Sequence, residues 1–270
     1  MAIKMKKYLA LILALVMVFA VALTGCGTTE DTGDVTQGTD DQGDATGADD
    51  GEEETPEDEV TVMSYEEYMA AELDSEVTIE AYVQAKQSWW EDTVTLYTQD
   101  EDGAYFVYSA ACTEEDYDKI EVGTKVRVTG YKSEWSGEIE IMDGTFEIID
   151  DGDTYVAEPM DVTSLLGTDE LIDYQNRLVT FTGLTVEDSG DGAAFLYNWD
   201  GSGTDGNDLY FNASVNGQTY TFTVESDLCD NTTDVYAAVK NLQVGDVIDM
   251  EGFLYWYEGV NPHITSVVVK

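Results

Sequence analysis

An internal repeat constrains the fold of this chain more than any other feature of its sequence. Residues 119–137 align without a gap on residues 241–259, at a constant offset of 122. Further upstream, residues 77–81 match residues 179–183 at an offset of 102. The identical positions of the longer match are Val122 and Val244, Gly123 and Gly245, Gly130 and Gly252, and Gly137 and Gly259. Such self-similarity predicts two consecutive copies of one domain.

The order of the predicted elements in the first copy indicates a barrel. Apolar and polar residues alternate in the way that is typical of strands with one buried face. This pattern predicts strands at 77–89, 93–98, 105–110, 125–132 and 138–149, and a short helix at 113–119. Five strands with a helix between the third and the fourth is the order of the OB-fold, a Greek-key barrel.

The second copy is longer, so its strand count stays open. It has 20 extra residues between its first and fourth strands, which include a loop at 198–208. The dipeptide Asn216-Gly217 predicts an additional hairpin turn. In the first copy, Ser64 and Glu67 have the spacing of a capping box, which predicts a helix before the first strand.

The stretch Val122-Gly123-x-x-Val126-x-Val128-x-Gly130, followed by an aromatic-x-Gly, resembles the fourth strand and following loop of OB-fold domains of the tRNA-anticodon-binding type. The resemblance covers most of 64–150 and 163–270. It implies an all-β chain of two tandem five-stranded OB-like Greek-key barrels, each with a short helix, after a disordered acidic linker. We expect the first domain at 61–152 and the second, with loop insertions, at 160–270.

The first 26 residues have the features of an export signal. Three lysines precede an apolar run at 8–23, which is shorter than a membrane-spanning helix requires, and Leu23-Thr24-Gly25-Cys26 follows. This ending resembles the lipobox of bacterial lipoproteins. The resemblance implies a signal peptide at 1–25 and a lipid on Cys26 that anchors the protein to the membrane on its extracytoplasmic face, at the cell surface or in the periplasm. A plain secretory signal and a bitopic anchor remain the alternatives.

The next segment predicts a tether. Residues 27–60 contain 14 acidic residues and no lysine, arginine or aromatic residue. Such a segment cannot bury enough apolar surface to offset the entropy of ordering it, and its charges repel one another. We therefore expect a lipidated cysteine and a disordered acidic tether at 26–60.

The net charge of residues 61–270 indicates which classes of partner the chain favours. The whole sequence has 57 acidic and 11 basic residues, and 61–270 retains 43 acidic and 8 basic ones. Nucleic-acid binders normally present a basic surface, so nucleic acid is disfavoured as a partner, and we expect an envelope protein or a glycan. Half of the 8 basic residues are Lys119, Lys125, Arg127 and Lys132, which we interpret as a solvated strand with salt-bridge partners.

Aromatic residues mark the predicted ligand site. OB-folds bind ligands across strands 2 and 3 and through the loops that join strands 1 to 2 and 4 to 5. Aromatic rings in these loops can stack on sugars, bases or peptide planes. The alternative is that they cover the barrel ends or pack the two domains together. The candidates are Trp89, Trp90, Trp135, Tyr255, Trp256 and Tyr257.

The loop at 200–208 has the composition of a calcium site. It is rich in glycine and in oxygen ligands, and Asp200, Asp205 and Asp208 are its candidate metal ligands. The loop lacks the spacing of an EF-hand, so an ordinary long turn is the alternative. The sequence assigns no cofactor with certainty, and calcium is the one candidate.

Two cysteines and one histidine remain for other chemistry. Cys112 and Cys229 each follow a third strand, and they could form a bridge between the domains or remain separate buried thiols. His263 has no motif around it and is interpreted as a structural histidine.

Together these features predict a membrane-anchored extracytoplasmic lipoprotein that acts as a non-catalytic binding module for a protein or an oligosaccharide, with calcium as a possible aid. The alternatives are an extracytoplasmic hydrolase that uses carboxylates or a metal, and OB-type binding of single-stranded nucleic acid. No catalytic residue is assigned.

Overall fold

A computed structural model describes residues 60–270 of the chain. The predicted signal peptide, the lipidation site Cys26 and the tether up to residue 59 lie outside the described residues. Both copies of the repeat belong to one compact unit, Pro56–Lys270. Within the described part of the chain, no helix has the length and apolar character needed to span a membrane.

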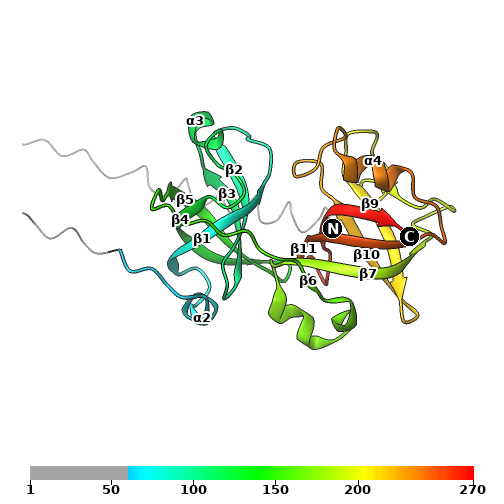
Figure 1. Cartoon of the computed structure of the whole chain (residues 1–270), viewed down its shortest axis with the longest axis horizontal. Helices are drawn as coiled ribbons and strands as arrows, with labels where there is room; N and C mark the ends of the chain where they lie inside the picture. Colours follow the sequence, from blue (N-terminus) through cyan, green and yellow to red (C-terminus); the bar gives the residue numbers. More distant parts are fainter. Residues whose placement is uncertain (1–59) are drawn as a thin grey trace, which may run out of the picture. The chain divides into compact units, whose positions relative to one another are not determined.

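The first copy is a closed five-stranded barrel (Figure 1). Its strands are β1 (Glu76–Lys86), β2 (Thr93–Gln99), β3 (Ala104–Ala111), β4 (Lys125–Trp135) and β5 (Glu138–Ile148). They pair in the order β1-β2-β3-β5-β4, and antiparallel pairing of β1 with β4 closes the ring. Strands β3 and β5 pair in parallel. The resulting strand order is that of the OB-fold, a Greek-key barrel. The predicted all-β barrel is confirmed.

Short capped helices accompany this barrel. Helix α2 (Tyr65–Ala70) begins at the predicted capping box, in which Ser64 and Glu67 exchange hydrogen bonds between side chain and backbone. Helix α3 (Glu114–Tyr117) lies between β3 and β4, and the side chain of Thr113 accepts a hydrogen bond from its first turn.

The second copy closes a ring of the same topology. Its five strands are β7 (Leu178–Glu187), β9 (Leu209–Val215), β10 (Gln218–Val224), β11 (Val247–Phe253) and β12 (His263–Val269). They pair in the order β7-β11-β12-β10-β9, and β9 also pairs with β7. The strand count that the sequence left open is therefore five.

The remaining elements of the second copy extend this ring without changing it. Helix α4 (Asp234–Lys240) lies between β10 and β11, as α3 does between β3 and β4. Two short strands, β6 (Met160–Asp161) and β8 (Leu196–Tyr197), add to β7 and β9. Two 3-10 helices, Thr163–Leu165 and Asp169–Tyr174, connect β6 to β7.

The hairpin at Asn216-Gly217 joins β9 to β10. Both residues have positive φ angles, 54° and 79°, which is the conformation of a type I′ turn and explains the Asn-Gly pair. The hairpin is therefore the connection between the second and third strands of the barrel, and not an additional element. The inserted residues instead lengthen the loop between β7 and β9.

The repeated glycines Gly130 and Gly252 occur where a strand is irregular. The β4–β5 register shifts at Gly130, and the β11–β12 register shifts at Gly252. A Cβ atom at Gly130 would lie 2.8 Å from the carbonyl oxygen of Met142, and one at Gly252 would collide with the carbonyl oxygen of His263. The repeat thus preserves a bulge at which the strands approach too closely for a side chain.

Each barrel has its own hydrophobic core, and a third cluster joins the two barrels. Tyr97 of β2, Phe106 of β3 and Phe253 of β11 form this third cluster. The ring of Tyr97 is stacked on that of Phe253, with centroids 4.5 Å apart. Gln175, which lies between the second 3-10 helix and β7, contacts β5. Its side-chain Oε1 accepts a hydrogen bond from the backbone N–H of Ile139.

Candidate functional site

The outer face of strands 2 and 3, where OB-folds bind ligands, differs between the two barrels. In the first barrel the second barrel covers part of this face. Phe106 of β3 packs edge-on against Tyr255 at a centroid distance of 5.3 Å, beside the stacked pair of Tyr97 and Phe253. In the second barrel the corresponding face of β9 and β10 is open and forms the floor of a hollow of about 560 Å³.

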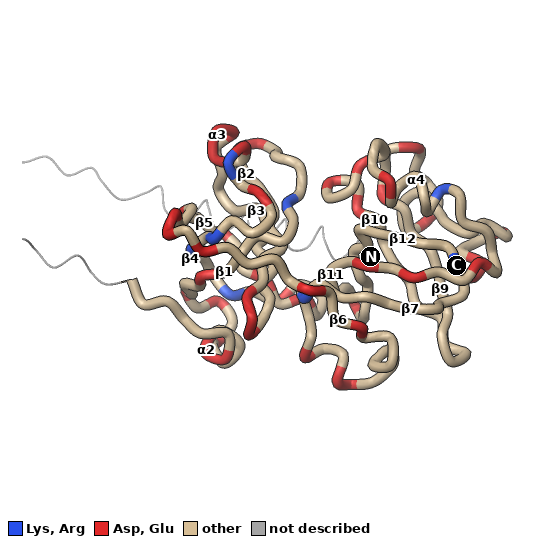
Figure 2. The backbone as a smooth tube through the Cα atoms, viewed as in Figure 1, with Lys and Arg blue, Asp and Glu red and all other residues tan. Residues whose placement is uncertain are grey.

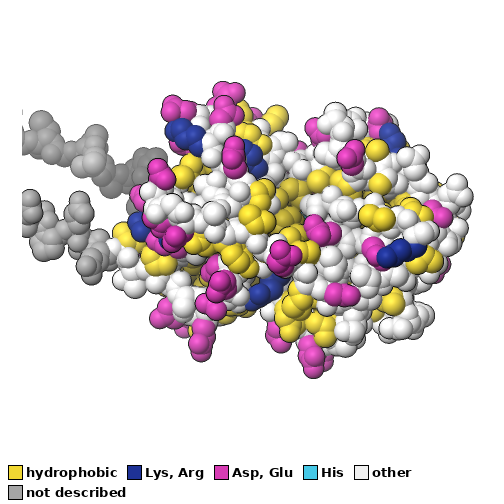
Figure 3. Space-filling model, viewed as in Figure 1, with side chains coloured by type: hydrophobic (Ala, Val, Ile, Leu, Met, Phe, Trp, Pro, Cys, Tyr) yellow, Lys and Arg dark blue, Asp and Glu magenta, His cyan; other side chains and the backbone are white. Residues whose placement is uncertain are grey.

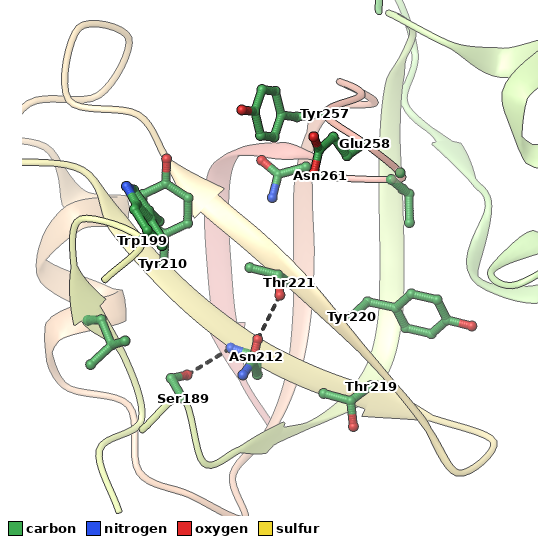
Figure 4. Close-up of a pocket in the computed structure, with 13 residues that line it drawn as sticks. Ser189, Trp199, Tyr210, Asn212, Thr219, Tyr220, Thr221, Tyr257, Glu258 and Asn261 are labelled. Atoms are coloured by element: carbon green, nitrogen blue, oxygen red, sulfur yellow. Dashed lines mark hydrogen bonds between the residues drawn. The ribbon is translucent and has the colours of Figure 1, made fainter. Parts of the chain in front are cut away.

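Two exposed aromatic side chains flank this hollow, which we call the β9–β10 pocket (Figure 4). Trp199 comes from the loop between β7 and β9 and is 76% exposed. Tyr257 comes from the loop between β11 and β12 and is 45% exposed. These are the two loops that OB-folds use for ligands, and Tyr210 and Tyr220 supply further rings from the strands.

Amide side chains lie on the floor of the pocket and are held in place. Asn212 accepts a hydrogen bond from Thr221 at 2.8 Å (Figure 4). It also donates one to the carbonyl oxygen of Asp188. Asn261 accepts a hydrogen bond from Thr223 at 3.0 Å through Oδ1, so its Nδ2 group is the part that can donate to a ligand. The pocket therefore combines rings for stacking with fixed amide donors.

The pocket carries little charge. Glu258 is its one acidic residue, and no lysine or arginine lines it. Burial, followed by the nearby charges of Asp208 and Glu225, raises the pKa of Tyr210 to about 12, so this phenol is neutral at physiological pH. A ligand would meet a largely neutral aromatic surface.

Figure 2 shows where the lysines and arginines fall along the backbone of the described residues. Their side chains are engaged within the protein. Lys125 and Arg127 pair with Glu80, so these two residues have the expected salt-bridge partners. The interpretation as a solvated strand is wrong for Lys132, which is buried and has no acidic partner among the described residues. Lys132 is buried and donates to three carbonyl oxygens at the end of α2. The others bind acidic or carbonyl oxygens as well: Lys86, Lys119, Arg177, Lys240 and Lys270.

The predicted aromatic residues of the first barrel lie in two hollows. Trp89 is half-buried against the core, and its indole N–H donates to the carbonyl oxygen of Cys112 at 2.8 Å. Trp90 is 71% exposed, and both residues line a hollow of about 340 Å³ together with Tyr108. Trp135 lines a different cavity, between the barrels.

The three predicted aromatic residues of the second barrel lie in three different environments. Tyr255 lines the cavity between the barrels and stacks on His263 at a centroid distance of 4.1 Å. Trp256 packs against the second core, and its backbone N–H donates to Glu138. Only Tyr257 reaches the β9–β10 pocket. The six candidates are thus brought together in pairs at most, and their role in binding stays a prediction.

The sequence reasoning missed most of this pocket. Trp199 lies directly before residues 200–208, whose composition predicts a calcium site. Tyr210 and Asn212 alternate with the buried residues Leu209 and Phe211, so the outward face of β9 was readable once β9 was recognised as the second strand.

The structure does not bring the three predicted calcium ligands together. Asp200 accepts a hydrogen bond from the backbone of Ser202, and Asp205 pairs with Lys240. Asp208 accepts hydrogen bonds from Ser226, far along the chain. Across residues 60–270 no group of three or more His, Cys, Asp and Glu side chains has a metal-binding arrangement. Calcium binding stays a prediction.

The two cysteines are separate buried thiols. Burial raises the pKa of Cys112 and of Cys229 to about 11, so neither is a reactive thiolate near neutral pH. Nδ1 of His263 lies 2.7 Å from the hydroxyl of Tyr97 and 3.3 Å from Oε2 of Glu225, in agreement with a structural role.

Comparison with known proteins gives a fold likeness alone. No protein-family model matches the chain, and no curated protein matches it. Among solved structures, a replication protein A heterotrimer bound to ssDNA is similar at 13% identity and a TM-score of 0.31; the match covers 72% of this chain and 49% of that one. The chain thus spans about half the length of that relative.

Two further solved structures were determined with double-stranded DNA. The Ifi202 HINa domain in complex with 20bp dsDNA is 12% identical, with a TM-score of 0.32, over 73% of this chain and 98% of that one. A murine DNA-binding protein bound with dsDNA is 10% identical, with a TM-score of 0.35, over 72% and 96%.

These structures run against the expectation about partners. The sequence disfavours nucleic acid and favours an envelope protein or a glycan, whereas the similar structures include chains solved with ssDNA and dsDNA. At 10–13% identity and TM-scores of 0.31–0.35, the likeness concerns the fold and assigns no partner to this chain. Net charge describes the average surface of the chain, whereas the β9–β10 pocket has a single acidic residue among those that line it.

Proposed function

We propose that this chain is a membrane-anchored, extracytoplasmic, non-catalytic binding protein that takes up single-stranded nucleic acid in the β9–β10 pocket. The observation that carries the proposal is the position of Trp199 and Tyr257. They come from the two loops that OB-type barrels use for ligands, and both line the pocket on its open strand 2–3 face.

Base stacking would supply the affinity. Unpaired bases have flat faces on both sides, and each base stacked on an aromatic side chain contributes about 1–3 kcal/mol. Rings at Trp199, Tyr210 and Tyr257 offer such surfaces, and the amide of Asn261 can donate to a base edge. A duplex hides its base faces, so single strands fit this pocket better than double strands.

Phosphate pairing would contribute little, because the basic side chains are engaged elsewhere. In most nucleic-acid binders, affinity falls with salt because lysines and arginines release counterions from the phosphates. Here the folded part carries 43 acidic and 8 basic residues, so screening reduces repulsion between ligand and protein. We therefore expect affinity to rise, or to stay level, as salt increases. Calcium would also raise the affinity, because it can bridge the phosphates of the ligand and the carboxylates of the protein.

Titration of intrinsic tryptophan fluorescence with short oligothymidylate and oligouridylate tests this proposal. We expect saturable quenching that is lost in Trp199→Ala and retained in Trp90→Ala, because both residues are exposed but only Trp199 lines the pocket. Absence of binding at every salt and calcium concentration would overturn the proposal. So would binding of a neutral oligosaccharide at the same pocket in place of the oligonucleotides.

The anchor is a separate part of the proposal and rests on the sequence of the first 26 residues. A lipid on Cys26 would hold the barrels at the outer side of the membrane, and the acidic segment 27–60 would space them from it. Labelling of cells with a radioactive fatty acid tests it. We expect label in the wild-type chain and none in Cys26→Ser, and equal labelling of both would contradict the anchor.

A further inference from the structure

A second cavity, distinct from the β9–β10 pocket, lies where the two barrels meet. It has a volume of about 370 Å³, within the range of small-molecule sites. Apolar side chains are visible between the barrels in Figure 3. Aromatic rings from both barrels form much of its wall: Phe106, Tyr108, Trp135 and Tyr255. We call it the junction cavity.

A buried carboxylate opens into this cavity without a partner. Glu140 lies on β5, is 4% exposed and lines the cavity. Among the described residues, no side-chain or backbone donor forms a hydrogen bond with its carboxyl group, whereas the neighbouring Glu138 accepts one from the backbone of Trp256. Because Glu140 lines the cavity and no donor in the described part of the chain occupies its carboxyl group, that group is available to a ligand.

A second carboxylate lines the same cavity. Oε2 of Glu225 accepts hydrogen bonds from Gln87 at 2.6 Å and from Tyr97 at 3.0 Å, and lies 3.3 Å from Nδ1 of His263. Glu225 is thus fixed by the protein. No lysine or arginine lines the junction cavity.

We propose that the junction cavity binds a small organic ammonium ion, with its charge against Glu140 and its alkyl groups against the aromatic wall. An ammonium group over an aromatic face is attracted by the ring quadrupole, and aromatic cages with acidic residues are suited to quaternary ammonium ligands. Trp135 gives a ligand access, since it is 60% exposed at the rim. An anionic or neutral ligand would leave the charge of an ionised Glu140 without a counter-charge.

The ionisation of Glu140 makes the predicted binding depend on pH. Burial raises the pKa of its carboxyl group to about 7. The titratable groups around the cavity are Tyr108 on β3, Glu225, Tyr255 and His263, and Glu138 lies two residues away on β5. A cation binds the ionised form, so affinity for a permanently charged ammonium ion should rise as pH increases through 7 and then level off.

Calorimetric titration of the full-length chain with choline tests the proposal, with 3,3-dimethyl-1-butanol as its uncharged analogue. We expect choline to bind with a dissociation constant on the order of millimolar or tighter and the alcohol to bind about tenfold more weakly or not at all. Glu140→Gln should reduce choline affinity about tenfold, and Trp135→Ala should reduce it several-fold.

The controls separate this site from the rest of the protein. Glu134→Gln removes an exposed carboxylate from the adjacent strand and should leave choline affinity unchanged. Trp199→Ala should also leave it unchanged, which distinguishes the junction cavity from the β9–β10 pocket. If Glu140→Gln fails to fold, the exposed Trp135 supplies the test. Equal binding of choline and the alcohol, no binding of either, or full affinity in both variants would overturn the proposal.

Discussion

The hydroxyl of Tyr97 in the first barrel lies 2.7 Å from Nδ1 of His263 in the second barrel. The same hydroxyl donates to Glu225 at 3.0 Å, and the Tyr97 side chain is 1% exposed. A buried polar network therefore crosses from one barrel to the other, beside the stacked rings of Tyr97 and Phe253.

We expect Tyr97→Phe to destabilise the protein by about 1–3 kcal/mol, because it leaves buried partners of the hydroxyl unsatisfied while the ring stays in place. Urea unfolding followed by tryptophan fluorescence measures this. Tyr131→Phe is the matched control, since Tyr131 is 45% exposed on the same barrel and should cost less than about 0.5 kcal/mol. Equal stability of the two variants would contradict the network's role.

The buried carboxyl groups of β5 predict the pH dependence of stability. Burial raises the pKa of Glu138 well above its usual range and that of Glu140 to about 7. The folded state therefore holds protons that the unfolded state, with carboxyl pKa values near 4.5, has already released. Stability is highest below the unfolded pKa and falls as pH rises through the folded values.

Thermal unfolding between pH 5 and pH 8 checks this prediction. The Tm of the wild-type chain should fall across that range, and the fall should be smaller in the double variant Glu138→Gln, Glu140→Gln, whose side chains do not ionise. General charge repulsion acts on both proteins alike, so the difference between their slopes isolates the two glutamates. If Tm falls equally with pH in both proteins, Glu138 and Glu140 do not determine the pH dependence of stability.

The repeated glycine of the fourth strand predicts a steric effect. A Cβ atom at Gly130 would lie 2.7 Å from Cγ2 of Ile141 and 2.8 Å from the carbonyl oxygen of Met142. We expect Gly130→Ala to cost about 1–3 kcal/mol in unfolding free energy. At Gly144 the nearest atoms would be 3.6 Å away, so Gly144→Ala should be neutral within about 0.5 kcal/mol. The reverse ranking in chemical denaturation would refute the bulge argument.

The buried Lys132 stabilises the contact between α2 and the first barrel. Its ammonium group donates to the carbonyl oxygens of Tyr68, Met69 and Ala71, and burial lowers its pKa. Lys132→Met should destabilise the chain by about 2–3 kcal/mol, because it orphans these carbonyl groups. Lys119→Met removes an exposed ion pair and should cost at most about 1 kcal/mol. Guanidinium unfolding of both variants measures the two losses of unfolding free energy and compares them.

The fold was largely readable from the sequence, for identifiable reasons. Strict alternation along β1 and β4 reflects one buried face, and the Gly130 and Gly252 match reflects a bulge that both barrels need. The second copy was harder to interpret because its inserted residues separate β7 from β9, so the Asn216-Gly217 hairpin was taken as an addition.

The candidate site was less predictable. Only Tyr257 of the six aromatic candidates reaches the β9–β10 pocket. The two barrels pack through the strand 2–3 face of the first, and a repeat in sequence cannot reveal that one copy's ligand face is covered. Glu140 could not be singled out among 57 acidic residues, because burial depends on the contact between the barrels.

The salt dependence of oligonucleotide affinity tests the central claim most directly. It compares wild-type protein with Trp199→Ala and, as a control, Trp90→Ala, using oligothymidylate over a range of salt concentrations. We predict that wild type and Trp90→Ala bind with affinity that is level or rises with salt, and that Trp199→Ala loses about 1–3 kcal/mol of binding free energy. Affinity that falls steeply with salt, or that does not depend on Trp199, would contradict stacking in the β9–β10 pocket.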